Sequence, residues 1–297
     1  MLKDDIQDLL RLEKPTVPLY HYTTQAGLLG IVGSKKRSLW ATHHQCLNDT
    51  QEFLHAKGLI RAEIDRCRAT ADSDSRSLLE EMDSALGGPG NEEVNLYIAS
   101  FSEDGDSLPQ WRAYGGQTAG FALGFWGDRL VLPERFTMAR CIYNPEKQYE
   151  VAKAIVAEVL EIGLSQMPTV GSDNAKLGAR FGLLLNLHRF ALFFKHKKFE
   201  GEKEWRIISP VLMDFKPAYS VQEETELAFR QGRSMLIPYR RVPLKDDKGG
   251  FPLDSVVVGP NPNKEQSLRS VCSFLNSQGL EEAAKKSRSS DIPYRNW

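Results

Sequence analysis

The chain has 297 residues, with 38 Lys and Arg against 39 Asp and Glu, and a formal net charge of -1. This length fits one large domain or two small ones and is enough to bury a substantial hydrophobic core. A net charge so close to zero excludes a global electrostatic attraction to nucleic acid or to a membrane surface.

Cysteine usage and hydropathy narrow the class of protein further. The four cysteines lie far apart with no Cys-x-x-Cys pair, which argues against a zinc ribbon or a thioredoxin-type site and suits a reducing cytosol. No apolar run reaches membrane-spanning length, and the first residues lack the basic start and apolar stretch of a signal peptide. We therefore expect a cytoplasmic protein that does not enter a membrane.

The first half of the chain is predicted to combine short strands with helices. The expected elements are an amphipathic helix within residues 1–18, strands at 19–23 and 38–42, a short helix between them that Thr23 or Thr24 caps and Gly33 ends, and a longer helix after a capping box at 48–52 in which Asp49 is the cap. Residues 70–92 are polar and rich in helix formers, so we expect a variable surface excursion there.

The second half continues the same mixture and sets the fold class. The expected elements are strands at 94–102, 120–126, 138–143, 204–208 and 256–258, helices at 145–164, 173–196 and 264–278, and a hairpin over 227–241 that turns at Gly232. The helix at 173–196 is apolar nearly all round, so it is expected to be central and buried. Because no regular βαβ alternation is present, we predict one α+β domain over 1–297, with largely antiparallel sheets and a helical insert at about 144–197.

The strand Glu204-Trp-Arg-Ile-Ile208 carries the most suggestive chemistry. Side chains alternate along a strand, so Glu202, Glu204 and Arg206 share one face while Trp205 and Ile207 point toward a core. Gly201 would let the chain turn sharply before the acidic pair. Two carboxylates and a guanidinium fit a solvated sheet face, or the wall of a sugar-binding cleft.

Several common active-site motifs are absent, and the other candidates each have a structural alternative. The chain has no phosphate loop, dinucleotide fingerprint, His-Glu-x-x-His pair or nucleophile elbow. His43 and His44 are adjacent on a strand and point to opposite faces, so we expect no metal site. His21, beside two tyrosines, is either a structural histidine or a ligand-binding one. The basic cluster 195–198 is a solvated helix end or a phosphate contact.

The segment Gln110-Trp-Arg-Ala-Tyr114 follows a long polar loop and precedes two glycines. Trp111 and Tyr114 are suited to stacking on a flat cationic ring, and Arg112 to pairing with a phosphate or with a carboxylate such as Glu204. The alternative is a small Trp/Tyr core with a structural Arg–carboxylate bridge.

The order of these elements resembles the ADP-ribosyltransferase fold. More narrowly, the chain resembles a widespread bacterial family of uncharacterised proteins that is placed near that superfamily by fold. The segments that carry the resemblance are Leu19-Tyr-His-Tyr-Thr23, Leu39-Trp-Ala-Thr42, Leu47-Asn-Asp49 with Glu52, Ser100-Phe-Ser-Glu-Asp-Gly-Asp106, Gln110-Trp-Arg-Ala-Tyr-Gly115, Glu202-Lys-Glu-Trp-Arg206 and Ile292-Pro-Tyr-Arg295. Split antiparallel sheets with inserted helices are the fold that this resemblance implies.

The resemblance also implies NAD as a substrate and a set of site residues. Glu204 would be the catalytic glutamate, and Glu202 would orient the acceptor. His21 would orient NAD through a ribose hydroxyl, with Tyr22 and Thr23 beside it. Either Ser102 or Tyr114 would fill the second position of the motif, and the spacing does not decide between them. Trp40, Trp111 or Tyr114 would hold the nicotinamide ring, while Arg112 and residues 195–198 would contact the pyrophosphate.

The functional hypothesis is an NAD-dependent ADP-ribosyltransferase that modifies an intracellular macromolecule, as a bacterial toxin or defence effector with an antitoxin or regulatory partner. An NAD glycohydrolase would use the same site with water as the acceptor. A non-catalytic module that binds a nucleotide or a partner would keep the fold without turnover. An RNA-directed phosphate-transfer enzyme is disfavoured by the lack of a basic stripe.

Overall fold

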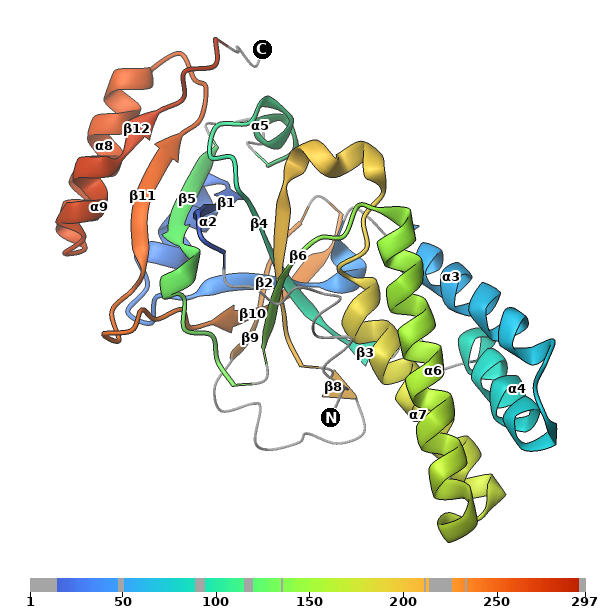
Figure 1. Cartoon of the computed structure of the whole chain (residues 1–297). Helices are drawn as coiled ribbons and strands as arrows, with labels where there is room; N and C mark the ends of the chain where they lie inside the picture. Colours follow the sequence, from blue (N-terminus) through green and yellow to red (C-terminus); the bar gives the residue numbers. More distant parts are fainter. Residues whose placement is uncertain are drawn as a thin grey trace.

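The computed structural model describes residues 15–47, 51–88, 94–114, 120–134, 136–210, 212–213, 226–232 and 234–293. A ten-stranded, mostly antiparallel sheet lies at the centre of this part of the chain (Figure 1). Its strands are β1 (Pro18–Thr23), β2 (Leu39–His43), β4 (Tyr97–Ser102), β5 (Phe121–Trp126), β6 (Thr137–Arg140), β7 (Glu204–Ile208), β9 (Glu226–Gln231), β10 (Leu236–Val242), β11 (Leu253–Val258) and β12 (Arg288–Ser289). A separate pair is formed by β3 (Val94–Asn95) and β8 (Leu212–Met213).

Strand β4 is the point where the sheet branches. Along one edge it pairs with β7, from Ile98 opposite Ile208 to Ser102 opposite Glu204. Its other edge pairs with β2 at the start of the strand and with β1 at the end, where Ser102 lies opposite Tyr20. The sheet therefore divides between β1 and β2 into two arms, β1–β5–β11–β12 and β2–β10–β9.

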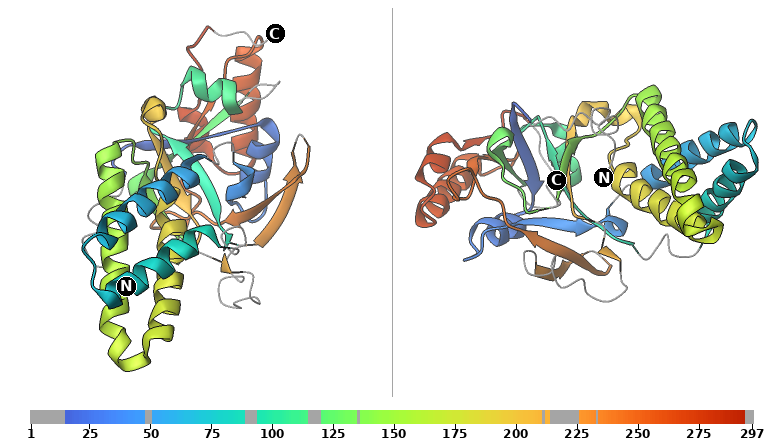
Figure 2. Two further views of the ribbon diagram at one scale, coloured as in Figure 1. Left: turned by 90° about the vertical axis from the view of Figure 1, so that its right-hand side faces the viewer. Right: turned by 60° about the horizontal axis from the view of Figure 1, so that its bottom comes forward.

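Helices surround this sheet, and most of them lie at its two ends. They are α2 (Gln25–Val32), α3 (Gln51–Arg68), α4 (Ser73–Gly87), α5 (Leu108–Tyr114), α6 (Pro145–Val170), α7 (Ser172–Ala191), α8 (Lys264–Ser277) and α9 (Glu281–Lys286), with 3-10 turns η1 (His44–Cys46), η2 (Gly127–Arg129) and η3 (Lys197–Glu202). Helices α3, α4, α6 and α7 gather on one side, and α8 and α9 lie beside β11 at the opposite end (Figures 1 and 2). None of the helices in the described ranges combines the length and hydropathy needed to cross a membrane.

Two large hydrophobic cores and one small cluster of Tyr22, Trp111, Ala122 and Val257 follow from this arrangement. The first lies among the four clustered helices and takes Ile98 and Ile208 from the sheet. The second lies against the other face of the sheet and includes Phe101, Trp205 and Ile207. Successive residues of β4 and β7 therefore face different cores, because side chains alternate between the two faces of a sheet.

Much of the predicted secondary structure is confirmed. The acidic strand forms β7, the hairpin forms β9 and β10, and the helical segment within 144–197 forms α6 and α7. Thr24, one of the two proposed caps, accepts a hydrogen bond from the backbone N–H of Gly27. The sheet is mostly antiparallel and mixed with helices, as the α+β prediction requires. Of the helix expected within residues 1–18, residues 1–14 lie outside the described residues, as does the Asp49 cap, and Pro18 begins β1.

Three expectations were wrong. Residues 70–92 were expected to form a surface excursion, but within them α4 buries Leu78, Leu79 and Met82 in the helical core, because its apolar residues recur at helical spacing. Helix α7, apolar nearly all round, was expected to be central and buried, yet it leaves a stripe of Leu177, Phe181 and Leu185 exposed. The turn before β7 uses Lys203, whose φ is 46°, and not Gly201.

Candidate active site

Strand β7 is buried on both faces, so the idea of a solvated acidic wall was wrong. Trp205 and Ile207 pack into the second core, while Glu204 and Arg206 lie under the four helices with little exposure. Burying a carboxylate or a guanidinium is unfavourable unless each finds charged and hydrogen-bonding partners. The partners of Glu204 and Arg206 therefore explain why these two charged side chains can be buried.

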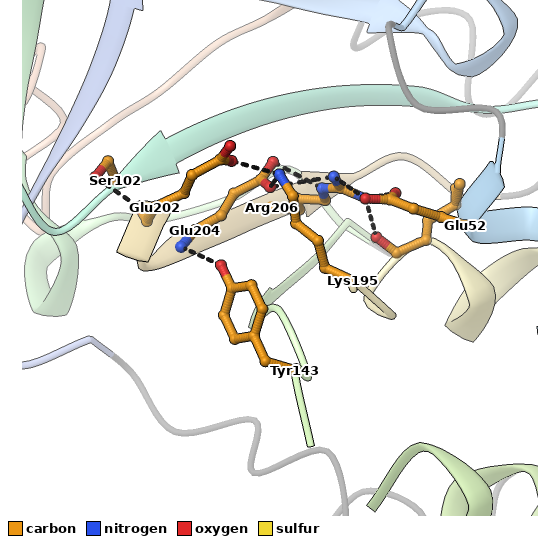
Figure 3. Close-up of polar contacts among 8 residues, drawn as sticks. Glu52, Ser102, Tyr143, Lys195, Glu202, Glu204 and Arg206 are labelled. Atoms are coloured by element: carbon orange, nitrogen blue, oxygen red, sulfur yellow. Dashed lines mark hydrogen bonds and ion pairs between the residues drawn. The ribbon is translucent and has the colours of Figure 1, made fainter. Parts of the chain in front are cut away.

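Arg206 is the centre of a buried charge network that joins β7 to α3 and to the end of α7. It donates to both carboxylate oxygens of Glu204, at 2.8 and 3.1 Å. It also donates to both oxygens of Glu52, one of them at 3.0 Å, and to the carbonyl oxygen of Leu192 at 2.6 Å. These bonds use all five N–H donors that a guanidinium has. Figure 3 shows the two carboxylates on either side of Arg206.

Lys195 extends this network to Glu202. Its ammonium group donates to Glu204 and to Glu202, at 2.5 Å in each case, and lies 5.4 Å from the centre of the Phe199 ring. Glu204 and Lys195 are buried, but the side chain of Glu202 is 27% exposed. The network thus reaches solvent at Glu202.

Backbone contacts hold both ends of the Lys195–Glu204 contact in place. The backbone N–H of Glu204 donates to the hydroxyl of Tyr143 at 2.8 Å, and its carbonyl accepts from the N–H of Cys141 at 2.8 Å. The backbone N–H of Lys195 donates to the carbonyl of Ile142 at 3.0 Å. The strand and the segment after α7 are thus tied to the chain between β6 and α6.

The electrostatics of the site fix its charge state. Burial alone would raise the pKa of Glu204, but Arg206 and Lys195 outweigh burial and bring that pKa to about 2. Burial lowers the pKa of Lys195, and Glu204 more than restores it, so that pKa is raised. Glu204 is therefore a carboxylate and Lys195 an ammonium at neutral pH. This pair can stabilise charge, but it cannot exchange protons easily.

The structure brings Ser102 and Tyr114 to the same side of the sheet as Glu204. Ser102 lies directly opposite Glu204 on β4, and its hydroxyl donates to the backbone carbonyl of Glu202 at 2.8 Å. Tyr114, at the end of α5, is 45% exposed. Desolvation raises the pKa of Tyr114, and the negative charge of Glu204 raises that pKa further.

His21 does not join this group, contrary to the expectation that it would converge with Glu204. Tyr20, Ser102 and Glu204 form one row across β1, β4 and β7, so the next residue on β1 points to the other face. There the His21 ring packs edge-on against Phe101, and its Nδ1–H donates to the carbonyl of Ser100 at 2.9 Å. Burial lowers its pKa to about 4, so the imidazole is neutral.

The remaining predicted NAD contacts are spread over the fold. Trp111 is buried against the Tyr22 ring, and its indole N–H donates to Asp106 at 2.8 Å, which matches the small-core alternative. Arg112 is exposed on α5, whereas the cations that contact Glu204 are Arg206 and Lys195.

Two other predicted contacts lie on β1 and β2. Trp40 stacks on Tyr239 across β2 and β10, with ring centres 4.6 Å apart. Thr23 follows His21 by two residues on β1 and so shares its face.

Sequence reasoning missed Glu52 and Tyr143. Glu52 was placed in a capping box and among the segments that carry the resemblance, but nothing local in the sequence relates α3 to a strand 154 residues away. Lys195 was singled out only as part of a basic cluster. Its position directly after the buried Phe193 and Phe194 was the available signal, because a charge that follows a buried run needs a partner.

One family model, without an assigned function, matches a part of the chain that includes most of this site. The model of a family described as "Protein of unknown function (DUF2971)" matches residues 110–207. That stretch is less than half of the chain, and it contains Tyr114, Lys195, Glu202, Glu204 and Arg206. No curated protein and no solved structure matches the chain.

Proposed function

We propose that the chain transfers ADP-ribose from NAD to an intracellular macromolecule, with Glu204 as the carboxylate that stabilises the reacting ribose. The observation that carries this proposal is an ionised glutamate fixed opposite Ser102, with Tyr114 nearby and the partly exposed Glu202 two residues before it. The ADP-ribosyltransferase resemblance supplies the substrate.

The chemistry needs electrostatic stabilisation more than proton transfer. The bond between ribose C1′ and the nicotinamide nitrogen breaks, and nicotinamide leaves with the bonding electron pair as a neutral molecule. Positive charge develops on the ribose, and hydrogen bonds to its 2′-hydroxyl strengthen in the transition state. A fixed carboxylate facing that charge stabilises the transition state more than the ground state. The acceptor nucleophile then bonds to C1′ and gives its proton to water.

Lys195 has to move for this to happen. Its ammonium group neutralises Glu204 in the structure, but Glu202 already provides a second partner at 2.5 Å. In the proposal, NAD binding shifts Lys195 toward Glu202 and toward the pyrophosphate, and leaves Glu204 facing the ribose. His21 has no direct contact with NAD in this scheme.

A non-catalytic module that binds a nucleotide or a partner is the second candidate. The specific observation in its favour is that both oxygens of Glu204 already contact Arg206, and one also contacts Lys195. A carboxylate so fully paired serves folding without any turnover.

Nicotinamide release from NAD, measured with and without cell lysate, separates these candidates. ADP-ribosyl transfer predicts that nicotinamide release depends on lysate, and that label from adenylate-labelled NAD appears on a macromolecule. An NAD glycohydrolase, in contrast, releases nicotinamide without lysate. We expect Glu204→Gln to lower turnover by about 10²–10³-fold. Glu200→Gln, an exposed glutamate on η3, is the matched control. Binding of NAD without release, unchanged by Glu204→Gln, would leave only the non-catalytic module.

A further inference from the structure

A basic hollow lies away from the candidate active site. Its volume is about 650 Å³, and it is open to solvent between the end of α2, the chain between β10 and β11, and the end of α8. In Figure 1 these segments meet at the lower left. The hollow is lined by residues 33–37, 243–245, 249–251 and Gln278. None of these residues belongs to the Arg206 network.

The charged residues that line this hollow are all cations. They are Lys35, Lys36, Arg37 and Lys245, and no Asp or Glu is among the lining residues. Over the described ranges of the chain, the three lysines form no salt bridge. These four positive charges repel one another, and a concave surface focuses their positive electrostatic potential.

The nearest acid along the chain is turned toward its own loop. One oxygen of Asp246 accepts from the backbone N–H groups of Lys248 and Gly250, at 3.0 and 2.7 Å. Its carboxylate therefore shapes the turn beside Lys245. A positive φ of 80° at Gly249 completes this turn and keeps the rim of the hollow free of a side chain at that position.

Arg37 has a structural role that the lysines do not share. Its guanidinium donates to the carbonyls of Val32 and Gln278, at the ends of α2 and α8, and lies over the ring of Phe251. Basic side chains at helix C-termini are commonly explained by such contacts with the last carbonyls. That explanation accounts for Arg37, but not for Lys35, Lys36 and Lys245.

We propose that this hollow binds the polyphosphate group of a small phosphorylated molecule. Lysine ammonium groups are suited to phosphate as mobile point charges, whereas Arg37 forms a fixed part of the wall. The volume is in the range of small-molecule sites, about 300–1,000 Å³. A compact hollow favours a free ligand over a nucleic-acid backbone, which would need basic residues along an extended path. The proposal does not depend on NAD turnover at Glu204.

Titration calorimetry on the full chain tests this site with inorganic tripolyphosphate and with ATP, at low and physiological salt. The test variant replaces Lys35, Lys36 and Lys245 with alanine. A matched control variant replaces three exposed lysines elsewhere, Lys147, Lys153 and Lys264. We expect the test variant to lose affinity by at least about tenfold, because each lysine removed deletes one charge-assisted contact. The control variant should bind as the wild type does.

The outcomes separate a built site from general attraction. Retained binding when the same three lysines become arginine supports a site that recognises charge at these positions. Equal losses in the test and control variants, or no binding of either probe, overturn the proposal. A single-stranded RNA that binds more tightly than both probes, with the same lysine dependence, assigns the hollow to nucleic acid and overturns the small-molecule class. Circular dichroism of each variant confirms that the fold is intact.

Discussion

Replacing Glu52 with glutamine tests the buried network most directly. The side chains of Glu52 and Arg206 are only 6% and 4% exposed, so water cannot replace the lost carboxylate. Glutamine keeps one acceptor oxygen but presents an NH₂ group to the second guanidinium N–H. Removing one partner of a buried ion pair costs about 3–5 kcal/mol. Because Arg206 retains Glu204, we expect the lower end, a loss of about 3 kcal/mol in the free energy of unfolding.

Urea unfolding followed by tryptophan fluorescence measures this loss. With a slope of about 3 kcal/mol per molar urea, the unfolding midpoint should fall by about 1 M. Glu202→Gln is the matched control, because it makes the same chemical change at a side chain that is 27% exposed. We expect that control to cost less than about 1 kcal/mol. If Glu52→Gln shifts the midpoint no further than the control does, the network does not hold α3 on the sheet.

Two further predictions concern buried titratable groups. The ring resonances of His21, followed by NMR, should stay constant from pH 8 to about pH 5 and move near its lowered pKa of about 4. Since the unfolded imidazole binds its proton near pH 6.5, His21 should reduce stability as pH falls from about 6.5 to 4. Burial raises the pKa of Cys141 well above its usual range, so iodoacetamide should label it only after unfolding.

Each of these predictions has a clear contrary result. Titration of His21 at about pH 6 or above would mean that its ring is hydrated and not fixed on the carbonyl of Ser100. Labelling of Cys141 in native protein as fast as in urea would mean that the segment between β6 and α6 opens readily. That segment holds the backbone of Glu204, so the candidate site would then be poorly ordered.

Local patterns predicted most of the strands, because alternation and turn residues are readable in a single sequence. The strand at 204–208 and the hairpin with its turn at Gly232 were found in this way. The burial of one side of α4 was not predicted, because polar residues make up most of this helix, while Leu78, Leu79, Met82 and Leu86 decide where it packs.

The site was harder to predict than the strands. Alternation placed Glu204 and Arg206 on one face correctly, and the pairing of Ser102 with Glu204 agrees with its proposed place in the site. The same rule places Tyr20 and His21 on opposite faces of β1. Which of the two would share a side with Glu204 depends on the register between β1 and β4, and register is a long-range property that one sequence does not reveal.

The contacts of Arg206 limit which segments of this protein can be deleted or exchanged. Its donors end on α3, on the chain just after α7 and on its own strand. Deleting residues 145–192 would remove the Leu192 carbonyl, and exchanging α3 for an unrelated helix would remove the Glu52 carboxylate, so either change would leave N–H donors of this buried cation without an acceptor. A viable truncation, whether made by engineering or found in a distant homologue, should therefore replace this arginine in the same step.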